Sequence, residues 1–241
     1  FMAIGGVFFV VGGGFLSDIN WRFPFGIYFI GLVLLPFVIL FLKEKKIEST
    51  QEELSIDIGK NMLVVYFLAF IYMLLFFILP TQIPFLLIEK FEASGKMAGT
   101  VIATAFFCNA LGAIAFSKLK KYLNFIAIYL IGITLMALGF SLVGVINHIY
   151  FFFITSPILG FAGGIMMTNA TAWMLSKTSH EKRVKSSGYF TSAIFLGQFL
   201  SPIVFHPFLD FLEIQDFFLY IGLSLFFVSF ISFSILKIRQ K

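Results

Sequence analysis

Long apolar runs follow one another along the whole chain, and each is about as long as a helix that crosses a lipid bilayer. Of the 241 residues, 60% are hydrophobic and only 12% are charged. A water-soluble domain carries about twice that share of charge. In lipid, backbone amides are satisfied only in helices or closed barrels, and the runs lack the alternation typical of barrel strands. We therefore predict an all-α integral membrane protein.

The apolar runs predict eight transmembrane helices. Their expected bounds are 1–17, 24–43, 61–88, 97–117, 122–145, 148–175, 186–209 and 214–236. Most connections are short, but KEKKIESTQEELSIDIGKN, 43–61, is too long for a turn between helices and carries charges of both signs. We predict that residues 44–60 form a cytoplasmic linker between a two-helix unit, 1–43, and a six-helix unit, 61–241.

The distribution of basic residues indicates how the chain is oriented in the membrane. All but three of the 17 Lys and Arg lie in every second connection and in the C-terminal tail. The exceptions, Arg22, Lys90 and Lys96, lie in the alternate connections. Because basic residues concentrate on the cytoplasmic side, the richer connections and the C-terminus are expected to be cytoplasmic. The net charge of +5 then reflects topology, and we expect no nucleic-acid partner.

The predicted spans contain few residues suited to catalysis. All 12 acidic residues lie in connections or at helix ends, so no carboxylate lies within a span to carry a proton or cation. The single cysteine, Cys108, excludes an intrachain disulfide and a cysteine-based metal site. Motifs of hydrolases, metalloproteases and P-loop proteins are missing. We predict neither an enzyme nor a metal or cofactor site. His206 is either an interfacial structural histidine or a proton relay.

Uncharged polar side chains inside the spans are the remaining candidates for contact with a substrate. In ILPTQIPFLL, Gln82 lies between Pro80 and Pro84, which interrupt the backbone hydrogen bonds of a helix. Interrupted helices are tolerated in membranes where they line a water-filled cavity. A buried amide needs a partner, so each such side chain either bonds to a neighbouring helix or contacts a substrate. The selected substrate-cavity residues are Tyr72, Gln82, Asn109, Asn169 and Gln198.

Glycines recur at helical spacing within the apolar runs. Helices in lipid associate through close contacts between small residues, because lipid tails are as apolar as the helices. Glycines seven residues apart lie almost on one face near the N-terminus, and Gly160 and Gly164 form a GxxxG pattern. We therefore predict close helix packing at Gly5, Gly12, Gly13, Gly160 and Gly164.

Four segments, in order along the chain, resemble the later part of a major facilitator superfamily transporter. GGGFLSDINWRFPF resembles that family's fifth helix and outer loop, and the predicted linker resembles its long central loop. RVKSSGYFTSAIFLGQFLSP resembles the start of its eleventh helix. GAIAFSKLKK, 112–121, resembles its cytoplasmic loop motif GxxxDxxGR[RK] at Gly112, Lys120 and Lys121. The resemblance implies the fold of that family: two helices of the N-terminal half, the complete six-helix C-terminal half, and four further helices upstream of this chain.

The same resemblance implies a function, secondary active transport by alternating access. Within the family, the chain is most similar to bacterial efflux permeases of the drug and sugar-efflux type. That likeness implies proton-coupled export of drug-like or sugar-like molecules across the inner (plasma) membrane, by a full-length protein that is monomeric and uses the proton gradient instead of a cofactor. Two alternatives stay open: an uptake symporter of the same fold, and a membrane receptor or assembly protein that does not transport.

Overall fold

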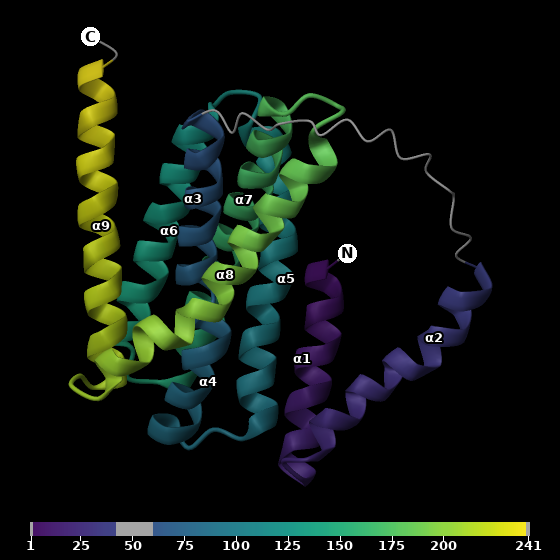
Figure 1. Cartoon of the computed structure of the whole chain (residues 1–241). Helices are drawn as coiled ribbons and strands as arrows, with labels where there is room; N and C mark the ends of the chain where they lie inside the picture. Colours follow the sequence, from purple (N-terminus) through teal and green to yellow (C-terminus); the bar gives the residue numbers. More distant parts are fainter. Residues whose placement is uncertain (1, 42–59, 240–241) are drawn as a thin grey trace.

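A computed structural model describes residues 2–41 and 60–239, which are almost entirely helical and contain no strand (Figure 1). The elements, in chain order, are α1 (Met2–Ile19), η1 (Phe23–Tyr28), α2 (Phe29–Phe41), α3 (Lys60–Phe76), α4 (Ile78–Phe91), α5 (Gly95–Leu119), α6 (Phe125–Val145), η2 (Ile149–Phe151), α7 (Phe152–Lys177), α8 (Arg183–Leu209) and α9 (Ile214–Arg239). The predicted linker 44–60 lies outside the described residues, apart from its last position, which begins α3.

Seven helical segments of the described chain are long and apolar enough to cross a membrane. They correspond to the second to eighth predicted spans, and each bound lies within three residues of its prediction. The first predicted span corresponds to α1, whose apolar part, Ala3–Ile19, is shorter than the other seven. The prediction of an all-α membrane fold is therefore confirmed, with seven full-length spans and one shorter apolar helix in the described residues.

The polar connections lie alternately at the two ends of the helices, as the alternation of basic residues predicted. In Figure 1 the connections between α4 and α5 and between α8 and α9 lie at the lower end, with the C-terminal end of α1. Those between α5 and α6 and between α7 and α8 lie at the upper end, close to the C-terminus of the chain. We call the lower end the predicted outer end and the upper end the predicted inner end.

One predicted span, 61–88, is built from two helical segments. Helices α3 and α4 meet at Phe77, three residues before Pro80. Proline has no N–H to donate to the carbonyl four residues earlier, and its ring crowds that carbonyl, so the helix is interrupted one turn before it. The hydroxyl of Thr81 donates to the Phe77 carbonyl at 2.7 Å, which stabilises the junction. The interruption sets the direction of α4 at the predicted outer end.

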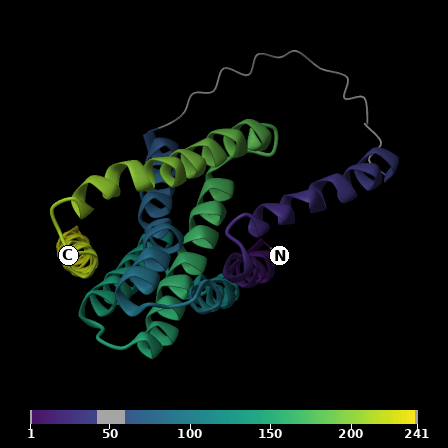
Figure 2. The ribbon, with the colours of Figure 1, turned by 90° about the horizontal axis from the view of Figure 1, so that it is seen from below.

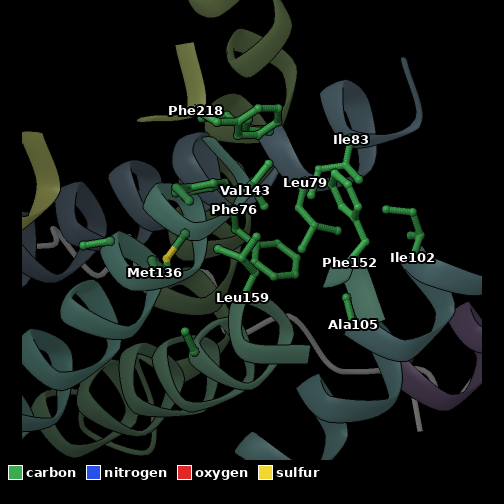
Figure 3. Packing of buried hydrophobic residues seen from close by; sticks show 14 of the residues in the cluster. Phe76, Leu79, Ile83, Ile102, Ala105, Met136, Val143, Phe152, Leu159 and Phe218 are labelled. Carbon is green, nitrogen blue, oxygen red and sulfur yellow. The ribbon is translucent and has the colours of Figure 1, made fainter. Parts of the chain in front are cut away.

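The core lies among α3 to α7 and α9. Helix α5 packs most extensively against α7, α6 against both α7 and α9, and α3 against α8. Figure 3 shows Phe76, Phe152 and Phe218, which come from α3, α7 and α9, in one cluster with Met136 and Leu159. By contrast, α2 leans away from the other helices (Figure 2) and has no buried residue. A face this apolar in water is unfavourable, so lipid or further helices must cover α2.

Two of the predicted packing glycines lie where α5 and α7 approach most closely. A Cβ atom at Gly160 would overlap the carbonyl of Ala105, and one at Gly164 would overlap the carbonyl of Asn109. Gly112 of α5 faces α7 in the same way, because a Cβ there would overlap the Phe161 carbonyl. Without side chains at these positions the two helix backbones come into direct contact, which is the packing that small residues permit in lipid.

The expectation of close packing is not met at Gly5, Gly12 and Gly13. A Cβ built at any of them would have no heavy atom within 4 Å. The contact of α1 with α5 instead uses Gly14, whose Cβ would lie 2.6 Å from the Gly95 carbonyl oxygen, and, about two turns earlier, Gly6 beside Phe106. Helical phase accounts for Gly5 and Gly12, which point away from the face shared by residues 6, 10 and 14. Gly13 lies almost on the same face as Gly6 but still meets no neighbouring atom.

Candidate functional site

The five predicted substrate-cavity residues do not meet in one place. Tyr72 is only 1% exposed and packs in the core, with its ring 5.7 Å from that of Phe76. Asn169 is fully buried and donates from Nδ2 to the Phe125 carbonyl at 2.9 Å. Asn109 is half-buried against the glycine face of α7, and Gln198 is half-buried in α8. Tyr72 and Asn169 are therefore enclosed by protein, as is typical of residues with a structural role.

Gln82 differs from the others because it lines a polar cavity at the predicted outer end. The cavity has a volume of about 340 Å³ and lies between α4 and α8, and the start of α9 closes one side. We call it the outer cavity. Its lining residues are Gln82, Phe85, Glu89, His206, Leu209, Asp210, Leu212 and Ile214. Other hollows, such as one between α8 and α9, are lined mostly by aromatic and aliphatic side chains and offer little polar recognition.

Helical spacing places the polar residues of the outer cavity on facing surfaces. In α4, Gln82 and Glu89 are seven residues apart and therefore lie on one face, about 10 Å apart along the axis. In α8, His206 and the helix-ending residue Asp210 are four apart, also on one face. Pro207 removes one backbone hydrogen bond near this end of α8. The carboxylates thus lie at the mouth of the cavity and the Gln82 amide lies deeper.

Next to the outer cavity, a buried glutamine holds three helices together. Gln215, only 7% exposed, donates from Nε2 to the carbonyl of Ile146 at the end of α6, and its Oε1 accepts from Lys90 at the end of α4. A buried amide with both ends bonded is stabilising, and a charged donor strengthens the bond. The Lys90 ammonium is therefore bound to Gln215 and does not line the cavity.

The histidine and carboxylates of the outer cavity do not form a metal centre. Within the described residues no three His, Cys, Asp or Glu side chains are grouped so that they could hold a metal ion. Glu89, His206 and Asp210 are all exposed at the cavity mouth. Their arrangement suits hydrogen bonding and charge attraction to a solute that enters from the outer end.

A second polar contact at the outer end joins α1 to α5. The Asp18 carboxylate accepts the backbone N–H of Gly95 at 2.6 Å and of Lys96 at 3.0 Å. These N–H groups belong to the first turn of α5, where no carbonyl within the helix can accept them and the helix dipole favours a negative charge. The Lys96 ammonium lies 4.4 Å from the centre of the Phe15 ring. Together with Gly14 and Gly99, these contacts form what we call the outer seam.

The sequence of the described helices from α3 onward matches a known protein family. The family model described as Major Facilitator Superfamily matches residues 65–241, from α3 to the end of the chain. The chain belongs to the Major Facilitator Superfamily. It is accordingly a multi-pass membrane transporter of the major facilitator type, and that family transports solutes rather than transforming them. None of the curated proteins compared with the chain matches it.

The loop motif that suggested the superfamily is divided between a helix and its end. Gly112 lies within α5, buried against α7, and so belongs to the helix contact rather than to a loop. Lys120 caps the end of α5, donates to the Leu123 carbonyl at 3.3 Å and lies over the ring of Phe125 at 4.3 Å. Lys121 follows in the turn. In this superfamily member the segment fixes the turn between α5 and α6.

Sequence reasoning missed Asp18, Glu89 and Asp210. Each lies at a helix end, whereas acidic residues are considered above only as proton or cation carriers within the spans. A signal was nevertheless available, because an amide and an acid share a face of α4 and a histidine and an acid share a face of α8. That the two faces meet depends on the packing of α4 and α8, which no local pattern indicates.

Proposed function

We propose that this protein is a secondary active transporter that exports small organic molecules by alternating access, driven by the proton gradient. Membership of the Major Facilitator Superfamily carries the proposal. Export and proton coupling are supported by the likeness of GGGFLSDINWRFPF and its surroundings to efflux permeases. On the same grounds we place the protein in the inner (plasma) membrane with a cytoplasmic C-terminus, as a monomer that needs the bilayer and a small-molecule substrate but no nucleic acid or cofactor.

The outer seam supports alternating access. Helix α1 belongs to the predicted unit 1–43 and α5 to the predicted unit 61–241, so the seam joins the two units that would rock against each other. Its glycines bring the backbones together, and Asp18 binds the first turn of α5. A transporter that opens outward must separate these contacts, so the structure has the geometry of a state closed at the outer end between α1 and α5.

The energy available is sufficient for export. Each proton that moves inward across a potential of 100 mV releases about 2.3 kcal/mol. At about 1.4 kcal/mol per factor of ten, one proton per substrate sustains roughly a fifty-fold concentration ratio of an uncharged substrate. No ATP-binding motif is needed for transport of this size.

Flux through proteoliposomes tests the proposal. The full-length protein would be reconstituted and a panel of sugars, amines and amphipathic drugs assayed with and without an imposed proton gradient. Export predicts that substrate moves against an opposing proton flow and that the flow accelerates it. Movement of substrate and protons in the same direction would indicate an uptake symporter instead. Flux that ignores the gradient would refute proton coupling, and no flux of any compound would refute transport.

A further inference from the structure

The outer cavity is lined by an amide that bonds to no described residue. Gln82 is only 4% exposed, yet no described residue forms a hydrogen bond with its side-chain amide, which lines the cavity. A buried amide left unbonded costs about 1–3 kcal/mol, so such groups are rare unless water or a ligand satisfies them. Gln215, in the same helical bundle, shows the alternative, a buried amide with both ends hydrogen-bonded. The Gln82 amide is therefore available to a molecule in the cavity.

Charge determines which kind of molecule fits. Glu89 and Asp210 place two carboxylates at the mouth, and the Lys90 ammonium, which bonds to the neutral Gln215 amide outside the lining, offsets only one of them. His206 can accept or donate a hydrogen bond in its neutral form. A solute that carries positive charge is attracted by this mouth, whereas a carboxylate or phosphate is repelled. The Gln82 carbonyl oxygen, deeper in the cavity, can accept from an N–H group.

The remaining walls are apolar. Phe85 lies on the same face of α4 as the polar residues, and Leu209, Leu212 and Ile214 come from the end of α8 and the start of α9. A volume of about 340 Å³ is at the lower end of the range for small-molecule sites. The ring of Phe85 can also attract an ammonium group through its π face. The cavity thus suits a small cation with an apolar body.

We propose that the outer cavity binds small organic amines, whose ammonium group contacts Glu89 and Asp210 and whose apolar body lies against Phe85 and Leu209. In the transport cycle of an exporter, this is the site that a substrate of the amine class occupies before it leaves at the outer end, and in that respect the proposal rests on the proposed function. The binding itself does not require transport and can be measured at equilibrium.

Equilibrium binding of a simple amine tests this site. The full-length protein, purified in detergent, would be titrated with phenethylamine and binding followed by saturation-transfer NMR. The neutral analogue phenethyl alcohol and the anionic analogue phenylacetate have the same ring and chain length. We expect the amine to bind at least about ten times more tightly than either analogue, since a bond to a charged partner is about twice as strong as a neutral one.

Variants at the mouth locate the binding. Glu89→Gln and Asp210→Asn should each weaken amine binding about three- to ten-fold, and the double variant should weaken it further. Glu213→Gln is the matched control, because Glu213 is exposed at the same end but does not line the cavity. It removes the same charge and should leave amine affinity within about two-fold of the wild type, as expected for an exposed charge.

Each outcome decides the proposal. Equal binding of amine and phenylacetate, or equal losses in Glu89→Gln and Glu213→Gln, would overturn it. Proteoliposome flux separates this result from the function itself. If the protein transports but does not bind the amine selectively, the proposed site is wrong and the proposed transport function stands. Selective amine binding without any flux would support the site and refute transport.

Discussion

Replacement of Gln82 by methionine should leave the protein at least as stable as the wild type. The two side chains have nearly the same volume, so the substitution neither opens a cavity nor overpacks the core. The wild-type amide is 4% exposed and bonds to no described residue, so its removal breaks no protein hydrogen bond. Substitution of a buried amide that stabilises the fold would instead lower the stability. The change in stability therefore distinguishes an amide that serves ligand binding from one that serves folding.

The magnitude follows from the state of the amide. An unsatisfied buried amide costs about 1–3 kcal/mol, which Gln82→Met would relieve. The cavity is open at its mouth, so water can bond the amide and reduce the gain towards zero. We expect the free energy of unfolding to rise by between 0 and about 2 kcal/mol. Amine binding should weaken, because the deep hydrogen-bond acceptor is lost.

Gln215→Met is the matched control for this prediction. It makes the same substitution at a buried glutamine, but it removes the bonds to the Ile146 carbonyl and the Lys90 ammonium. Hydrogen bonds between membrane helices contribute about 0.6 kcal/mol on average and up to about 1.7 kcal/mol, and the Ile146 carbonyl is left unpaired as well. Gln215→Met should therefore lower stability by about 1–3 kcal/mol.

Denaturant-induced unfolding in one detergent, followed by helical circular dichroism, measures both variants. The reasoning fails if Gln82→Met lowers the free energy of unfolding as much as Gln215→Met does. In that case Gln82 has a structural partner and the outer cavity has no amide free for a ligand. Unchanged amine affinity in a stable Gln82→Met protein would exclude the amide from the binding site.

Three further perturbations test other contacts. Asp18→Asn should accelerate hydrogen exchange in the first turn of α5 by several-fold, because the charged acceptor for two N–H groups is lost, and unchanged exchange would show that the outer seam does not depend on it. Gly160→Ala should lower the melting temperature strongly by forcing α5 and α7 apart, whereas Gly12→Ala, which meets no atom, should hold or raise it. Gln215→Leu should lower stability by about 1–3 kcal/mol in the unfolding assay, and a neutral result would contradict the three-helix contact.

The fold could be predicted because membrane insertion depends on properties that are local in sequence. The length of each apolar run determines whether it can span, and the sorting of Lys and Arg orders the connections. The site could not be predicted in the same way. Gln82 and Gln215 are both amides in apolar helices, and only packing distinguishes the bonded one from the free one.

Glycine positions show the same limit at a finer scale. Gly160 and Gly164 have the spacing of a packing face, and they lie on the face of α7 that meets α5. Near the N-terminus the spacing is equally regular, but Gly14 rather than Gly12 or Gly13 meets the neighbour. A regular repeat specifies a face of the helix without indicating which face the neighbouring helix covers.

The outer cavity and the outer seam are connected by the short turn between α4 and α5. Glu89 lines the cavity near the end of α4, and Asp18 binds the first turn of α5, with only residues 92–94 between the two helices. The turn is closely constrained: Glu92 has a left-handed φ of 50°, and the Ser94 hydroxyl accepts the N–H of Met97. A turn of this kind cannot lengthen, so a movement of α5 that opens the seam must also move the end of α4. In the proposed mechanism, binding of a solute in the outer cavity and separation of the two units would therefore involve the same turn.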